Sequence, residues 1–152
     1  MIPCIDIILD HKYACREPLL QSLKQLSNDD FTRNLGNTSI RDIMVHIMNT
    51  EVHWISLLSD MDTGSLDPEE FKDVESVAKT WKKIERETRE FVSNQSEVSL
   101  HYVKSVDWEK GTESFTVAKA LIHMATHETH HRGFIIGLLR QMGYEPPNVN
   151  ML

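Results

Sequence analysis

HMATHETHHRG, at His123–Gly133, is the stretch that says most about how this chain folds. It holds four of the eight histidines within nine residues, inside an otherwise apolar segment. Spacings of three and four residues place side chains on one helix face, and at 100° per residue these four fall within an arc of about 100°. Because imidazole is the commonest protein ligand for zinc and related ions, the stretch predicts half of a metal site on a long helix. Solvent or a crevice could instead accommodate the four polar rings.

A metal site needs further ligands, because one helix face rarely supplies three with good geometry. The other histidines are His11, His46, His53 and His101. His46 interrupts the core-like run Ile43–Met48, where a polar ring needs a partner, so we expect it to be the third ligand. His53, seven residues later on the same predicted helix, is the weaker choice, and His11 and His101 are expected to face solvent.

Hydrophobic residues recur with a helical period in four segments of the chain. The predicted helices cover residues 5–26, with a kink or break near residues 14–17 ahead of Pro18, then 39–59, 76–93 and 117–142. Residues 60–75 are expected to form a crossing connection with one short helical turn at Pro68, and residues 98–115 a small hairpin or an irregular loop. These elements predict an all-α, four-helix bundle formed by a single domain over residues 1–152.

Composition excludes several classes of function. The chain has 152 residues and a formal net charge of −7, so it lacks the basic face that binding to a nucleic-acid backbone requires. It has no run of about 18 apolar residues and no basic-then-apolar leader, and we therefore expect an unexported, cytoplasmic protein that does not span a membrane. Cys4 and Cys15 lie too far apart along one helix for a disulfide, which fits thiols kept reduced.

Two motifs carry a resemblance to a known family. On the second predicted helix, His46 is followed by Glu51 five residues later and by Trp54 eight residues later. The last predicted helix carries HETHHRG at His127–Gly133. In these motifs, and in length and helix order, the chain resembles the DinB/YfiT-like metalloenzyme family of the DinB superfamily.

The resemblance implies an up-down-down-up arrangement of the four helices, often dimeric, and a divalent metal ion held by three histidines. Carried over by position, the implied ligands are His46, His127 and His131. His123 and His130 would lie beside them as pocket residues rather than as ligands. We therefore expect a metal centre between the second and the last helix, and a homodimer.

Other residues near the expected site have two interpretations each. Glu51 could orient a ligand histidine or pair with a basic residue such as Arg132, and Arg132 could bind an anionic substrate group or form a structural ion pair. His53 is kept as a further pocket residue. The chain departs from the family pattern at Phe134, where a glutamine is usual, and near Asn150, where many members have an acidic residue. These departures concern contacts to a substrate more than the metal.

The expected chemistry follows from three neutral imidazoles, which leave a coordination position open on zinc or nickel. Such an ion lowers the pKa of bound water, which permits hydrolysis, or removes the proton of a substrate thiol, which permits transfer of a sulfur nucleophile. The resemblance favours transfer of a low-molecular-weight thiol to a small molecule. The alternatives are a metal-dependent hydrolase, a non-catalytic bundle protein that binds metal, and an interaction protein without metal.

Overall fold

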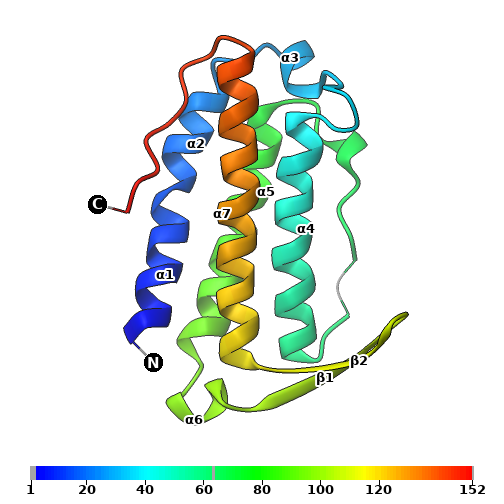
Figure 1. The fold of residues 1–152 in the computed structure, drawn as a ribbon, viewed down its shortest axis with the longest axis vertical. Coiled ribbons are helices and arrows are strands. Elements are labelled where there is room, and N and C mark those ends of the chain that lie inside the picture. The colour runs from blue at the N-terminus through cyan, green and yellow to red at the C-terminus, as the bar shows by residue number, and fades with distance from the viewer. Residues whose placement is uncertain (1–2, 63, 152) are drawn as a thin grey trace.

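Long helices dominate the computed structural model, which describes residues 3–62 and 64–151 (Figure 1). The helices are α1 (Pro3–Ala14), α2 (Arg16–Leu23), α3 (Asn28–Thr32), α4 (Ile40–Ser59), α5 (Val74–Ser93), α6 (Glu97–Leu100) and α7 (Val117–Gln141), with a 3-10 turn, η1, at Pro68–Glu70. The strands β1 (Val103–Trp108) and β2 (Gly111–Thr116) pair as an antiparallel hairpin. The hairpin confirms one of the two alternatives expected for that segment.

The long helices follow one axis in the order up, down, down, up. In Figure 1, α1 and α2 climb together from the N-terminus, α4 and α5 both descend, and α7 climbs again. Residues 60–62 and 64–73 lie along the outside of the bundle, and this return is why the successive helices α4 and α5 run parallel (Figure 1). Helix α7 packs against α1 and α4, and α5 packs against α4 and α2, so the helices close a ring. The predicted all-α four-helix bundle is confirmed.

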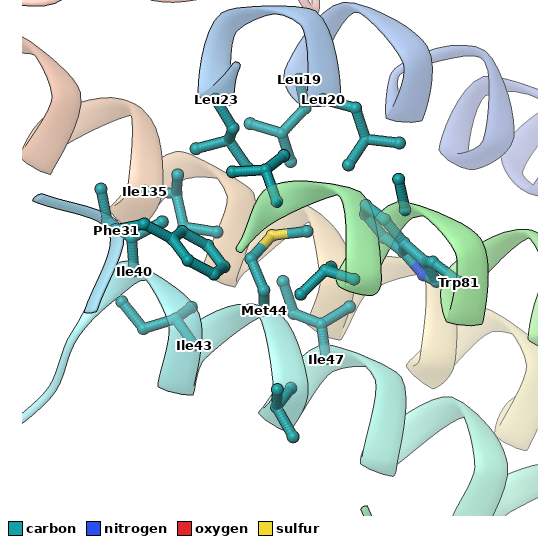
Figure 2. Packing of buried hydrophobic residues seen from close by; sticks show 14 of the residues in the cluster. Leu19, Leu20, Leu23, Phe31, Ile40, Ile43, Met44, Ile47, Trp81 and Ile135 are labelled. Carbon is teal, nitrogen blue, oxygen red and sulfur yellow. The ribbon is translucent and has the colours of Figure 1, made fainter. Parts of the chain in front are cut away.

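Hydrophobic side chains from every long helix fill the centre of this ring. In the part shown in Figure 2, Leu23 of α2, Met44 of α4, Trp81 of α5 and Ile135 of α7 belong to one cluster. Met44 and Ile135 are fully buried, and burying a side chain of this size contributes about 1.5–3 kcal/mol relative to exposure. A second cluster, which includes Leu121, fills the half of the bundle nearer the hairpin.

Local sequence explains where the helices begin. Ser39 and Thr116 each accept a hydrogen bond from the backbone N–H three residues on, which caps α4 and α7. The expected break in the first helix lies at Cys15. Pro18 then falls in the first turn of α2, where its missing N–H costs no helical hydrogen bond. The helical period did not predict α3 and α6, because at 5 and 4 residues they are too short to show one.

Candidate metal centre

Three imidazole rings meet between α4 and α7. His46 comes from α4, and His127 and His131 come from α7, where a spacing of four residues puts them one turn apart on the same face. The Nε2 atoms of His46 and His127 are 3.1 Å apart, and the potential ligand atoms of all three residues lie within 4.8 Å of one another. The ring centroids are 4.4–4.9 Å apart. The structure thus brings together the three histidines that the sequence singled out, which we call the histidine cluster.

The neighbours of His46 explain how it reaches this position. Val45 and Ile47 are buried, so apolar contacts hold this part of α4 in the bundle while His46 itself is exposed. His127 and His131 are half-buried on the facing helix. The histidine cluster therefore stands on two rigid helices and is open to solvent on one side, which leaves access for a small molecule.

Two of the rings are held in the neutral form. Burial, followed by the neighbouring rings of His131 and His46, lowers the pKa of His127 to about 4. Burial also lowers the pKa of His131, and His46 and His130 add to the effect. Neutral imidazole is the form that binds a metal ion, so at neutral pH these two rings need not lose a proton first.

The donor set fits a divalent ion. Two nitrogen atoms bound to one tetrahedral zinc, each at about 2.0–2.1 Å, would lie about 3.3 Å apart, close to the 3.1 Å between His46 and His127. The buried Nδ1 of His131 has no hydrogen-bond partner, an unfavourable state unless a ligand or water satisfies it. Within residues 3–62 and 64–151, no carboxylate or thiol joins the cluster, so three nitrogen donors would leave a coordination position open.

The other predicted pocket histidines differ in their distance from the cluster. His123 lies one turn from His127 on α7, with ring centroids 5.9 Å apart. His130 is exposed on the same helix beside the cluster. His53 is exposed and lies against the ring of Trp108 in the hairpin, and the structure shows no contact between it and the cluster in the part of the chain it describes. The rings of His123 and His130 thus both adjoin the cluster, at 5.9 Å from His127 and 5.0 Å from His131, whereas His53 does not.

A hollow of about 360 Å³ opens beside His123, between β2, α4 and α7. The rings of Trp54 and Phe115 form part of its wall and contact each other, and Trp54 also contacts His123. Lys119 adds a cationic side chain and Glu113 a carboxylate. Apolar walls with a few polar groups are typical of small-molecule sites. The hollow is therefore large enough for a small substrate one helical turn from the histidine cluster.

Glu51 and Arg132 lie in the core, and the structure confirms that Glu51 pairs with basic residues, although Arg132 is not one of them. The two side chains are only 1% and 2% exposed. Glu51 pairs with Lys12 and Arg16 instead of with Arg132 or a ligand histidine. Arg132 pairs with Glu128, one turn away on α7, at 3.4 Å. The structure thus favours the structural ion pair for Arg132 over a contact with substrate.

The sequence analysis missed a network of buried ion pairs that connects α1, α2, α4 and α7. Arg16 donates to both carboxylate oxygens of Glu128, at 2.7 and 3.3 Å, and also to Glu51. Lys12 Nζ lies 3.0 Å from Glu51 and 3.6 Å from Glu128. Burial alone would raise the pKa of Glu51, but Lys12 and Arg16 outweigh it and lower this pKa to about 2. A signal was present, because Lys12 and Arg16 continue the helical period of the buried Leu9.

Comparison with known proteins identifies the family. The sequence profile of the DinB family matches residues 5–152. The chain belongs to the DinB family. Protein DinB of Bacillus subtilis is 20% identical to it over 147 residues, which cover 90% of this chain and 85% of that protein.

Two solved structures share the fold of this DinB-family protein. A DinB-like protein from Bacillus cereus is 19% identical, with a TM-score of 0.70 over 88% of this chain and 89% of that chain. YfiT from Bacillus subtilis, described as a probable metal-dependent hydrolase with an unusual four-helix bundle topology, is 14% identical, with a TM-score of 0.68 over 93% of this chain and 86% of that chain. At these identities the likeness establishes the fold alone. None of the helices in the described part of the chain has the length and apolar character needed to cross a bilayer.

Proposed function

We propose that this DinB-family protein is a metal-dependent enzyme acting on a small molecule, with His46, His127 and His131 as ligands of a divalent ion. The observation that carries the proposal is the convergence of three imidazoles from two helices on one accessible place. The description of the relative YfiT as a probable metal-dependent hydrolase supports metal dependence. Zinc and nickel both suit three nitrogen donors, and we propose one of them as the ion.

We propose transfer of a low-molecular-weight thiol as the reaction. When bound, the ion would supply an open position where a thiol is held as the thiolate, its nucleophilic form. The hollow beside His123 would hold the second substrate against the rings of Trp54 and Phe115. Lys119 at the same hollow could pair with a negatively charged group of that substrate.

Hydrolysis is the second candidate, and the description of YfiT favours it. The two reactions differ in the nucleophile, which is a thiolate in one and a water-derived hydroxide in the other. The same cluster and hollow would serve either reaction. Dependence of the rate on added thiol therefore separates them.

Two further proposals concern the location and the assembly of the protein. We propose the cytoplasm, where the free thiols of Cys4 and Cys15 would stay reduced. We also propose a homodimer, for which Ile122 and Phe134 on α7, 39% and 48% exposed, offer apolar surface. Asn150, the other departure from the family pattern, is exposed in the C-terminal segment. Sedimentation equilibrium would detect the dimer, and a monomer at all concentrations would refute it.

Metal analysis of untagged protein tests the ligand assignment. Purified wild-type protein should carry close to one ion per chain, and His127→Ala should carry none. His53→Ala is the matched control and should equal wild type, because His53 lies outside the cluster. Full occupancy in the His127→Ala protein would defeat the assignment.

Cobalt-substituted protein tests the class of reaction. Adding a low-molecular-weight thiol should produce a sulfur-to-cobalt charge-transfer absorption that the His127→Ala protein does not show. An unchanged spectrum, together with thiol-independent cleavage of a simple ester, would favour the hydrolase over the transferase.

A further inference from the structure

A second hollow, of about 370 Å³, lies between α2 and α5. In the ring of helices this contact is opposite the one between α4 and α7, and the hollow shares no residue with the histidine cluster. Its walls hold four cationic side chains against two carboxylates, although the whole chain has a net charge of −7. The cations are Arg16, Lys82, Arg86 and Arg89, and the carboxylates are Glu17 and Glu85. Because Glu51 and Glu128 compensate Arg16 in the core, three cations face two carboxylates, and this small excess of positive charge would attract an anion.

The pairing inside this hollow leaves two of the cations free. Glu85 accepts a hydrogen bond from Arg16 at 3.2 Å and, through its other oxygen, one from Arg89 at 2.8 Å. The exposed side chains of Lys82 and Arg86, in contrast, have no ion pair or hydrogen bond to any residue that the structure describes. Glu85 therefore does not neutralise these two side chains by direct contact, and they remain available to a ligand.

Two hydrogen-bond donors in the same walls also lack acceptors. Tyr13 and Trp81 are 7% and 1% exposed, and neither the Tyr13 hydroxyl nor the Trp81 indole N–H has a partner within the described residues. Buried donors are nearly always paired, with protein, water or ligand, because an unpaired donor loses the free energy of its hydrogen bonds to water. Burial raises the pKa of Tyr13, which keeps its hydroxyl protonated as a donor. Both donor atoms are themselves buried beneath the wall of the hollow, so Lys82 and Arg86 are the unpaired groups that a ligand can reach.

We propose that this hollow binds a small organic oxyanion, a phosphate monoester or a carboxylate, through Lys82 and Arg86. Ammonium and guanidinium groups bind such oxygens by charge-assisted hydrogen bonds. Leu20, and those parts of the Tyr13 and Trp81 rings that Arg16 and Arg89 do not cover, provide a small area of apolar wall for the organic part of the ligand. The volume of the hollow suits a ligand of single-ring size. The site does not depend on the proposed metal chemistry, because no residue is common to both.

Calorimetric titration with phenyl phosphate, benzoate and inorganic phosphate tests this site. The protein used carries His46→Ala and His127→Ala, so that an ion at the histidine cluster cannot bind the probes. We expect one molecule of phenyl phosphate or benzoate per chain, and the tighter of the two identifies the class of oxyanion. Adding Lys82→Ala and Arg86→Ala should weaken that binding about tenfold or more.

The matched control removes the same two positive charges elsewhere. Lys110 in the hairpin and Arg140 near the end of α7 are exposed, and Lys110→Ala with Arg140→Ala should change the affinity by less than about twofold. Equal weakening by both pairs of substitutions would mean general attraction to a cationic surface and would overturn the proposal. Failure of all three probes to bind at millimolar concentration would overturn it as well, without affecting the proposed metal chemistry.

Discussion

Replacing Arg16 with methionine would remove the cation that joins α2 to α4, α5 and α7. The Arg16 side chain is buried, binds both oxygens of Glu128, donates to Glu51, and stacks 4.4 Å over the ring of Trp81. Methionine keeps much of the apolar volume but carries no charge. The two buried carboxylates would then keep Lys12, which lies near both, while Arg132 pairs with Glu128 alone.

The expected loss of stability from Arg16→Met is large. Removing one partner of a buried ion pair costs about 3–5 kcal/mol, because the remaining charge stays buried without full compensation. For a chain of this size, each kcal/mol lowers the unfolding midpoint by about 2–4 °C. We therefore expect the midpoint of Arg16→Met to fall by about 6–20 °C.

Circular dichroism at neutral pH measures both quantities: a urea titration gives the unfolding free energy, and a thermal melt gives the midpoint temperature. Arg33→Met is the matched control, because Arg33 is half exposed and its pair with Asp30 is at the surface, so the midpoint should not change measurably. Combining Arg16→Met with Glu128→Gln should not recover the loss, because Glu128 is also the partner of the buried Arg132. A loss below about 1 kcal/mol for Arg16→Met, the size typical of surface pairs, would refute the reasoning that these charges form one mutually compensated buried unit.

The same network predicts that the protein loses stability in acid, because the pKa of Glu51 in the folded protein is lowered to about 2. The ionised Glu51 carboxylate therefore contributes fully to the unfolding free energy above about pH 5, and this contribution is lost as the pH falls toward 2. Glu51→Gln should flatten that part of the curve of unfolding free energy against pH, and an unchanged curve would contradict the assignment. Ser39→Ala should lower the unfolding free energy by about 1 kcal/mol, measured by urea titration, because the N-terminal cap of α4 is lost. His46→Ala should abolish metal binding while His130→Ala retains it, as measured by elemental analysis, and loss in both would require a different ligand set. Chelation should lower the thermal midpoint of metal-loaded wild-type protein but not that of His46→Ala, because only the former loses a ligand bound to the native state.

The bundle could be predicted from sequence because it depends on local period. The set of His46, His127 and His131 needed the family resemblance as well, because local spacing alone did not separate His127 and His131 from His123 and His130. Each long helix carries a repeated apolar face, and that repeat indicates an amphipathic helix without knowledge of its neighbours. His127 and His131 share a face by spacing alone. His46 stood out because it interrupts a run whose neighbours, Val45 and Ile47, are buried in the structure. That these residues bind a metal ion stays a prediction.

The buried charges could not be paired from sequence, because the partners come from different helices. The motifs suggest a ligand histidine or a basic residue such as Arg132 as the partner of Glu51, whereas one partner in the structure, Arg16, lies 35 residues earlier in the chain. The helical period could place each of these charges on a core face, but only the packing of α1, α2, α4 and α7 decides which charges meet. The hollow between α2 and α5 has the same origin, since its walls come from segments distant in sequence.

The line of rings along α7 has a consequence for redesign of this protein. His123, His127 and His131 repeat every four residues, with successive ring centroids 5.9 and 4.4 Å apart. His46 on α4 faces His127 and His131. Thr50 lies one turn further along α4 on the same helix face, and because α4 and α7 run in opposite directions (Figure 1), we expect it to face His123 and His127. The double substitution His46→Thr with Thr50→His should therefore move the cluster of three nitrogen donors one helical turn toward the hairpin, to residue 50, His123 and His127, without a change of backbone. The bundle thus offers two neighbouring positions for a cluster of three histidines. Evolution or design could use this to change the residues around a bound ion without changing the fold.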